Sequence, residues 1–278
     1  MKLSVVWATR NEEANIARSI GSVKDIADEM IIVDEYSTDQ TRDIAEKLGV
    51  KVYLEPHHDI FHVTKQKALD KASGEWILQL DADEVVTDKL KKQIREVLEG
   101  SYKYIPNKIF DKHQSLIEAR DGKIGNASRE VVGYFIPRLN MFLGKPLVHA
   151  GVYPDGVIRL VRNGKAKFPQ KSVHEQISLD GGVSWLSGDL LHYDSPTLKR
   201  YLARLNRYTD LFAKEYSDQN LSKSFWNFFL FTIYKPFFTF FSLYLRHKGF
   251  LDGAPGFLWS FFSALRFPLS YFKYLTNK

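Results

Sequence analysis

The sequence has no cysteine among its 278 residues, which excludes disulfide scaffolds, thiolate nucleophiles and cysteine-ligated zinc sites. It also has no Gly-x-Gly-x-x-Gly turn, Gly-Lys-Ser/Thr phosphate loop, Gly-x-Ser-x-Gly elbow or His-Glu-x-x-His helix. These absences disfavour nicotinamide dehydrogenases, P-loop enzymes, elbow-type hydrolases and zinc proteases. With 44% hydrophobic and 26% charged residues, the chain is instead expected to be globular.

Charge and aromatic residues are unevenly distributed. Residues 199–278 hold 12 Lys or Arg and only 4 Asp or Glu, so the net charge of +6 arises at the C-terminal end. The same end holds 20 of the aromatic residues, between Phe225 and Tyr274. A nucleic-acid binder with an evenly basic surface has a different pattern, so no nucleic acid is expected as a partner. A basic, aromatic end predicts contact with a membrane surface.

The first hundred residues alternate short apolar runs with helical patterns. Buried strands are expected at 3–8, 30–33, 50–54 and 75–80, with helices between them and a further helix at 88–98. This alternation predicts an α/β fold with a mostly parallel sheet and helices on both faces. Residues 101–130 show no clear pattern. Short strand-like runs over 133–191 predict a smaller mixed or antiparallel extension of the sheet.

The C-terminal region is expected to be helical, starting at Ser195-Pro196. As a helix, residues 225–241 extend about 26 Å, which is short of the roughly 30 Å core of a bilayer, and Lys235-Pro236 is expected to interrupt them. Residues 257–272 contain Arg266 and Pro268. The preferred interpretation is two amphipathic, aromatic-rich helices at the membrane interface. A structural cap or dimer interface, and a true membrane span, are the alternatives.

Polar side chains follow several of the predicted strands. Asp81-Ala82-Asp83 ends one strand, and Asp34 and Glu35 follow another, while Thr9 and Asn11 close the first. Because the carboxyl ends of parallel strands share one edge of a sheet, these groups are expected on a common rim, where ligands bind in open α/β sheets. Two carboxylates one residue apart can hold a hard cation or divide between metal and ribose.

Several sequence blocks, taken together, resemble the family 2 glycosyltransferases. They are TRNEE at 9–13, VDEYSTD at 33–39 and GEWILQLDADE at 74–84. Three later blocks, VHE at 173–175, LHY at 191–193 and KGFLDG at 248–253, look like a bacterial branch similar to lipopolysaccharide inner-core β-glucosyltransferases. The resemblance implies an inverting enzyme with a type A nucleotide-sugar-binding domain over 1–194, comprising a nucleotide-binding half (1–100) and an acceptor half (101–194). A membrane-associating helical region would follow over 195–278.

The resemblance also implies roles for individual residues. The base and ribose pocket would be lined by Thr9, Asn11, Glu13, Asp34 and Glu35, with Lys65 contacting the nucleotide. Asp81 would meet the ribose or the metal, and Asp83 would hold Mg²⁺ or Mn²⁺ against the pyrophosphate, with His174 completing the metal shell. Glu35 departs from the family pattern, because many relatives have Asp or Ser at that place.

Inversion at the sugar requires one base to take the proton of the acceptor hydroxyl. Glu175 is the candidate, because its place in the sequence fits the family's base. Asp155 and Asp189 are held in reserve, and a surface Glu on a strand is the alternative interpretation. His174 and His192 are either metal or phosphate contacts or packed side chains. The arginines at 200, 204 and 207 either guide an anionic acceptor or form a solvated helix face.

The expected function is transfer of a hexose from a nucleotide-sugar, in the first instance a UDP-sugar, to a lipid-linked glycan such as lipopolysaccharide core or another surface polysaccharide. The polar turn at Thr9-Arg10-Asn11 comes too early for a signal-peptide core, so a cytoplasmic enzyme at the inner membrane face is expected. The rivals are a polyprenyl-phosphate glycosyltransferase and a catalytically inactive nucleotide-binding membrane scaffold.

Overall fold

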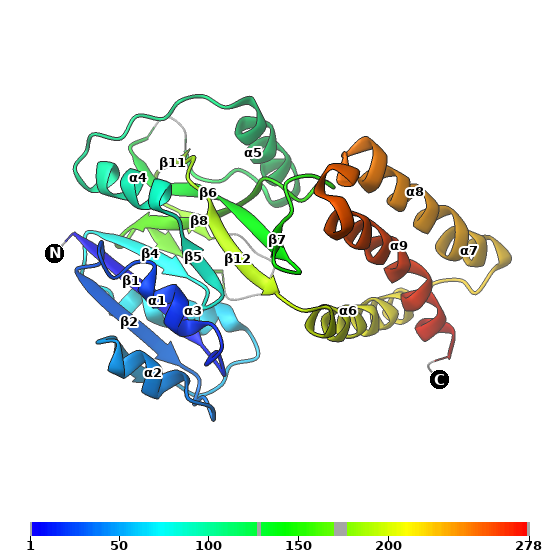
Figure 1. The fold of residues 1–278 in the computed structure, drawn as a ribbon, viewed down its shortest axis with the longest axis horizontal. Helices are drawn as coiled ribbons and strands as arrows, with labels where there is room; N and C mark the ends of the chain where they lie inside the picture. The colour runs from blue at the N-terminus through cyan, green and yellow to red at the C-terminus, as the bar shows by residue number, and fades with distance from the viewer. Residues whose placement is uncertain (1, 127–128, 170–176, 277–278) are drawn as a thin grey trace. The chain divides into compact units, whose positions relative to one another are not determined.

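The computed structural model describes residues 2–126, 129–169 and 177–276. Along the chain the strands and helices of the first part are β1 (Leu3–Thr9), α1 (Ile16–Gly21), β2 (Glu29–Asp34), α2 (Thr41–Lys47), β3 (Lys51–Leu54), α3 (Phe61–Lys71), β4 (Trp76–Leu80), β5 (Glu84–Val86), α4 (Asp88–Leu98) and α5 (Lys108–Asp121). There follow β6 (Val131–Phe142), β7 (Lys145–Pro146), β8 (Asp155–Arg162), β9 (Ala166–Lys167), β10 (Ser178–Leu179), β11 (Gly182–Trp185) and β12 (Leu190–Ser195). The C-terminal elements are α6 (Leu198–Asp218), α7 (Phe225–Phe229), η1 (Leu230–Tyr234), α8 (Lys235–Phe241), η2 (Ser242–Arg246), η3 (Gly249–Asp252) and α9 (Gly253–Thr276) (Figure 1).

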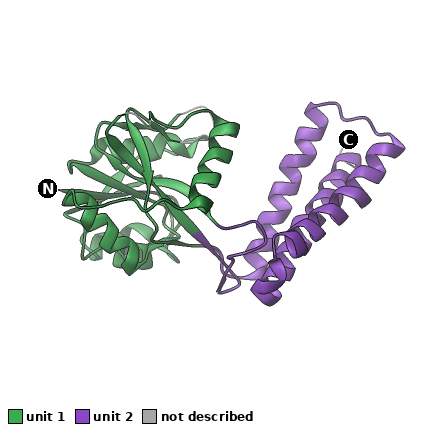
Figure 2. Ribbon diagram, turned by 90° about the horizontal axis from the view of Figure 1, so that it is seen from above, with its two compact units in different colours: residues 1–138, 154–192 green, residues 139–153, 193–278 purple. Residues whose placement is uncertain are grey.

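The chain forms two compact units, shown in different colours in Figure 2. Unit 1 comprises residues 1–138 and 154–192, and unit 2 comprises residues 139–153 and 193–278. Unit 1 contains the parallel strands and the polar rim expected from the sequence. Unit 2 contains the long aromatic-rich helices.

A single large sheet organises unit 1, with strand order β3-β2-β1-β4-β8-β6-β12-β5. The first four neighbours are parallel, whereas β8 runs antiparallel to both β4 and β6, and β12 runs antiparallel to β5. The predicted parallel sheet with a mixed extension is therefore confirmed. Because the chain leaves β1 toward β2 and β3 and then returns to β4 on the other side, the sheet has a topological switch point between β1 and β4, where open α/β sheets bind ligands.

Both faces of this sheet are covered. All seven residues of β1 are buried, and alternate side chains enter different clusters: Val5 and Trp7 pack with residues of α1, α2 and α4, whereas Val6 packs with residues of α3 and α5. This two-sided burial explains why the strand is almost continuously apolar. It also fixes the sheet rigidly enough to position the loops at its edge.

Helix α5 lies in the stretch for which the sequence showed no pattern. It buries Phe110 and Ile117, and the Phe110 ring stacks on Trp185 with centroids 4.8 Å apart. Only these two side chains of the helix are buried, so its apolar stripe is too short to produce a clear helical period. The Asn107 side chain accepts the Ile109 N–H at its start.

In unit 2, α9 packs against both α6 and α8. Phe231, Tyr271 and Tyr274 form one buried cluster with Ala213. A second cluster contains Phe142, Leu147 and Tyr201, with Trp259 and Phe262 packed against it. These aromatic contacts replace the aliphatic core that unit 1 has.

The expected interruption at Lys235-Pro236 is wrong. Residues Phe225–Arg246 form one helical run of 22 residues, long and apolar enough to cross a membrane by length and composition. Only 6% of its most apolar 18-residue stretch is buried. The π-helical segment η1 ends directly before Lys235, and its wider turn accommodates a proline, which lacks an N–H donor. Pro268 likewise lies inside the continuous helix α9.

The KGFLDG block has a structural explanation within unit 2. Lys248 has a left-handed φ of 57°, and a Cβ on Gly249 would lie 2.9 Å from the Leu243 carbonyl oxygen. Asp252 accepts hydrogen bonds from the His149 N–H at 2.8 Å and lies 2.7 Å from His149 Nδ1. The block therefore forms a tight turn that starts α9 and joins it to the loop after β7.

Glu29, at the start of β2, is the basis of a stability prediction. Burial raises the pKa of its carboxyl, but hydrogen bonds from Ser4, the Ser73 N–H and Lys51 outweigh burial and lower the pKa to about 2. The folded state therefore keeps Glu29 ionised after the unfolded chain has taken up a proton. Its contribution is present above about pH 4.5 and is lost as the pH falls toward 2.

We expect Glu29→Gln to lower the free energy of unfolding by about 1–3 kcal/mol at pH 7. The difference from the parent protein shrinks as the pH approaches 2, and urea titrations at several pH values measure it. Glu46→Gln, on the exposed face of α2, is the control, with an expected change below about 0.5 kcal/mol. A deficit that stays constant between pH 7 and pH 3 contradicts the assignment to ionised Glu29.

Candidate active site

The structure brings the predicted rim residues together at the carboxyl ends of β1, β2 and β4. Thr9 pairs with Asp34 in the parallel register of β1 and β2, and Trp7 pairs with Leu80 in that of β1 and β4. The Asp81–Asp83 loop therefore begins beside the end of β1. This edge is the switch point of the sheet.

Asp34 is fully buried, and protein donors occupy its carboxylate. It accepts hydrogen bonds from Thr9 Oγ1 at 2.8 Å, from the Ser37 N–H at 2.7 Å and from Ser37 Oγ at 2.6 Å. These bonds shape the turn after β2. Asp34 therefore fixes the conformation of this part of the rim.

The loops after β1 and β2 are tied to each other by side-chain bonds to backbone. Asn11, in a left-handed conformation with φ 55°, accepts the Thr38 N–H at 2.8 Å, and its own N–H donates to Ser37 Oγ. Glu13 accepts the Gln40 N–H at 3.0 Å. Asp39 accepts the Thr41 N–H of α2 at 3.0 Å. The two loops thus form one preorganised wall.

Glu35 is buried beside Asp34 and faces other protein groups. His57 Nδ1 lies 2.6 Å from its carboxylate, and the Thr64 hydroxyl donates to it. His57 is half exposed, so this pair connects the buried carboxylate to the surface. The longer side chain of Glu reaches the start of α3, where Thr64 is located.

Asp81 lies between two cations. Lys65 Nζ is 2.5 Å from one of its oxygens and Arg159 Nη2 is 2.5 Å from the other. Burial raises the pKa of the Asp81 carboxyl, but the charges of Arg159 and Lys65 outweigh burial and hold that pKa well below its usual value. With both oxygens engaged, Asp81 is less available to a metal ion than Asp83.

Arg159 also binds Glu84 and Gln79. Its Nη2 lies 2.7 Å from Glu84, which is fully buried, and its Nη1 lies 2.5 Å from Gln79 Oε1. Glu84 in turn accepts the Asp81 N–H at 2.9 Å, and the Glu84 N–H donates to the Asp81 carbonyl. The Asp81–Glu84 turn is therefore closed at both ends, which holds Asp83 at its tip.

Arg138 and Arg159 are site residues that the sequence analysis missed. Arg138, on β6, binds Asp155 at 2.6 Å and lies 3.7 Å from Glu84. The carboxylate of Asp155, a reserve candidate for the base, thus has a cation beside it. The second reserve, Asp189, precedes β12, where its carbonyl accepts the Thr87 hydroxyl. The signal in the sequence that could have revealed this network is the presence of arginines within the strand-like runs.

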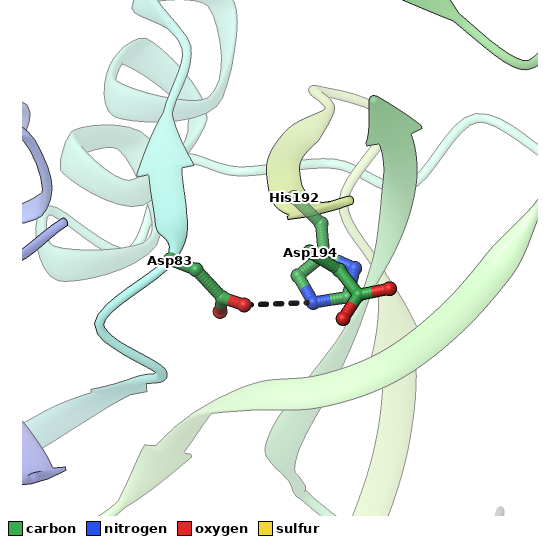
Figure 3. A group of neighbouring side chains, drawn as sticks. All are labelled: Asp83, His192 and Asp194. Carbon is green, nitrogen blue, oxygen red and sulfur yellow. Dashed lines mark ion pairs between the residues drawn. The ribbon is translucent and has the colours of Figure 1, made fainter. Parts of the chain in front are cut away.

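Asp83 points toward His192, whose Nε2 is 3.5 Å from the Asp83 carboxylate (Figure 3). In the antiparallel register of β12 and β5, His192 pairs with Glu84, so it lies next to the end of the Asp81–Glu84 turn. Burial raises the pKa of Asp83, but the hydrogen bond and charge of His192 outweigh burial and lower it. Asp83 is therefore ionised at neutral pH.

Asp194 follows His192 by two positions on β12, so its side chain leaves the strand on the same side (Figure 3). The sequence analysis did not single it out. Its carboxylate forms an ion pair with Arg204 of α6. Asp194 is therefore already partnered by a cation.

The pair of Asp83 and His192 fits a divalent cation. A carboxylate oxygen and an imidazole nitrogen face each other at 3.5 Å, with both side chains partly accessible, at 16% and 14%. The carboxylate oxygen suits Mg²⁺ or Mn²⁺, whereas the imidazole nitrogen suits a first-row transition ion such as Mn²⁺ better than Mg²⁺. Glu175 and His174, the expected base and metal-shell residue, lie outside the described residues.

The buried charge network predicts that Arg159 stabilises the fold as well as the site. We expect Arg159→Met to lower the free energy of unfolding by about 3–5 kcal/mol, because Asp81 and Glu84 lose their buried partner. Arg162→Met, on the same strand, removes more exposed pairs with Glu75 and Glu130 and is the matched control, with an expected cost below about 1 kcal/mol. Urea unfolding measures both variants, and equal costs would contradict the proposed role of the network.

Comparison with known proteins identifies related sequences. The sequence pattern described as "Glycosyl transferase family 2" matches residues 4–134. An uncharacterized glycosyltransferase of Rickettsia typhi, RT0209, is 30% identical over 266 residues, which cover 92% of this chain and 81% of the relative. The lipopolysaccharide core biosynthesis glycosyltransferase LpsC of Rhizobium meliloti is 26% identical over 280 residues, covering 96% and 92%. A crystal structure of S. aureus TarS 1–349 aligns over 98% of this chain and 92% of that chain, with a TM-score of 0.44 and 17% identity. Because the Rickettsia relative aligns along nearly the whole chain, and the family pattern covers the parallel strands that form the rim, this protein belongs to glycosyltransferase family 2.

Proposed function

We propose that the protein is an inverting, metal-dependent hexosyltransferase that uses a nucleotide-sugar, in the first instance a UDP-sugar. The observation that carries the proposal is the placement of Asp83. It is held at the tip of a closed turn, at the switch point of the sheet, beside His192. A partly accessible anion at this place suits a metal-bound diphosphate.

In the proposed mechanism, Asp83 and His192 would hold a divalent cation beside the pyrophosphate of the donor. When bound, that cation supplies positive charge that offsets the charge developing on the diphosphate leaving group. Lys65, which is 8% exposed, keeps Asp81 ionised and adds a cation to the same side of the site. The wall that contains Thr9, Asn11, Glu13, Asp34 and Glu35 lies at the same sheet edge and is the proposed side for the base and ribose.

Glu175 remains the proposed base. In this role it takes the proton of the acceptor hydroxyl while that oxygen attacks the anomeric carbon from the face opposite the leaving diphosphate. A single carboxylate is sufficient for inversion. The similarity to LpsC supports a lipid-linked glycan such as lipopolysaccharide core as the acceptor class.

The surface of unit 2 supports the proposed location at a membrane. Its helices expose many large apolar side chains, of which Phe225 is 82%, Trp226 68% and Phe237 66% exposed. Lys235 lies in the middle of the Phe225–Arg246 run. Since a charged residue near the centre of a membrane-spanning helix is costly, we propose interfacial contact rather than a span.

The metal and base roles predict different losses. We expect Asp83→Asn to lower turnover by about 10²–10³-fold, because it removes the anion that holds the metal, and to abolish the Mn²⁺-dependent rise in melting temperature with UDP. Glu175→Gln is expected to keep that thermal shift and lose transfer. Asp88→Asn, which is exposed at the start of α4, is the control and should behave as the parent protein. Full turnover by Asp83→Asn or Glu175→Gln would reassign the corresponding role.

The aromatic surface predicts a specific loss of vesicle binding. Replacing Phe225, Trp226 and Phe237 together by Ser is expected to weaken co-sedimentation with phosphatidylcholine vesicles by about tenfold or more, since each large side chain contributes roughly 1.5–3 kcal/mol when buried. Unit 1 offers a matched control in Ile105, Ile109 and Leu116, which are similarly exposed. If serine at those three positions weakens vesicle binding equally, non-specific hydrophobic adsorption explains the association.

A further inference from the structure

Unit 2 contains a cavity of about 320 Å³ between α6 and α9. This volume lies within the range of roughly 300–1,000 Å³ that small-molecule sites occupy. Its walls include Tyr201, Arg204, Leu205, Tyr208, Trp259 and Arg266. The lining therefore combines two guanidinium groups with aromatic and aliphatic surface, and we call it the α6–α9 pocket.

The two arginines of the pocket differ in their partners. Arg204 is paired with Asp194. Across the part of the chain that the structure describes, Arg266 has no ion pair with a carboxylate and instead lies over the rings of Phe212 and Phe267, at 5.8 Å and 4.8 Å from their centroids. The pocket thus carries a positive charge that no carboxylate of the described residues offsets.

Arg266 also stands in an unusual sequence context. It is a charged residue in the middle of α9, a helix that otherwise consists largely of apolar and aromatic residues. Its guanidinium offers a planar set of donors that matches phosphate oxygens, and aromatic surroundings increase the attraction by excluding water. An anion that can also contact apolar walls complements this combination.

We propose that the α6–α9 pocket binds the phosphate of an anionic membrane phospholipid, with the guanidinium of Arg266 as its main contact. The inference rests on the membrane contact proposed above and specifies which headgroup unit 2 selects. The apolar walls favour a lipid over a free phosphate, because they can contact the glycerol and the upper part of the acyl chains. Exposed aromatic side chains of the same unit suit the depth of the headgroups, where the lipid phosphates lie.

The experiment uses the full-length protein and two kinds of vesicle, phosphatidylcholine alone and phosphatidylcholine with one quarter phosphatidylglycerol. The parent protein is expected to bind the anionic vesicles more tightly. Arg266→Gln is expected to weaken binding to anionic vesicles by at least about tenfold, because it removes a charge-assisted phosphate contact. Binding to phosphatidylcholine vesicles is expected to stay within twofold, because the choline cation offsets the charge of the neighbouring phosphate and opposes its contact with a guanidinium. Melting temperatures verify that the variant is folded.

Arg200→Gln is the matched control, since it removes the same charge from an exposed position of α6 that does not line the pocket. General attraction to an anionic surface amounts to about fivefold per charge, so this variant is expected to lose no more than that. Arg266→Lys keeps the charge but removes the planar donor set, and an intermediate loss is expected. If Arg266→Gln and Arg200→Gln lose equal affinity for anionic vesicles, the proposed phosphate site in the α6–α9 pocket is wrong.

Other arms separate the possible failures. If 20 mM inorganic phosphate displaces the protein from anionic vesicles more than the same ionic strength of chloride does, a free phosphate is the ligand and the lipid assignment is wrong. Equal binding of the parent protein to both vesicle types would contradict the proposed phosphate site but not the proposed membrane contact. Binding to neither vesicle type would contradict both the phosphate site and the membrane contact. The UDP thermal shift of the same samples reports separately on the proposed transferase site.

Discussion

The structure of the site depends on the buried ion pairs of Arg159 with Asp81 and Glu84. Two carboxylates that lie only three residues apart repel each other and are costly to bury, so the turn that contains them is stable only with a cation between them. Arg159 provides that cation from β8, and Lys65 provides a second one from α3. Because these charges are matched beneath the surface, Asp83 can be presented at the rim without being drawn into the network.

The two units differ in the physical character of their cores and surfaces. Unit 1 has a largely aliphatic core on both faces of a sheet, and its polar groups gather at one edge, where backbone and side-chain bonds hold them in place. Unit 2 has an aromatic interior and an aromatic exterior, and its charges are mostly basic. A chemical reaction requires fixed geometry, whereas contact with a fluid lipid surface requires apolar area and positive charge. In the function proposed above, the chain therefore separates the residues that serve each purpose.

Most of the sheet and its rim were predictable from local patterns. Apolar runs located the first four strands, and the polar residues that follow them, such as Asp34 and Asp81, were placed at their carboxyl ends because parallel strands share an edge. Arg159 was not predictable in the same way, since its burial arises from pairing with residues distant in the sequence. The run Phe225–Arg246 was expected to break at Pro236. That expectation failed because the π-helical turn that accommodates the proline leaves no pattern in the sequence. Local preference predicts elements well, and long-range charge pairing decides the site.

The distance along the chain between Asp81 and its arginine has a consequence for the order of folding. The strands β1 to β4 are contiguous in the first 80 residues, so their parallel core can form while the ribosome is still making the rest. Arg159, which is 78 residues beyond Asp81, emerges much later. Until β8 joins the sheet, Asp81 and Glu84 lack the guanidinium that offsets their charge, so the turn that presents Asp83 lacks one of its main stabilising contacts. A nascent or truncated chain thus has the scaffold of the parallel strands before the proposed donor site is complete.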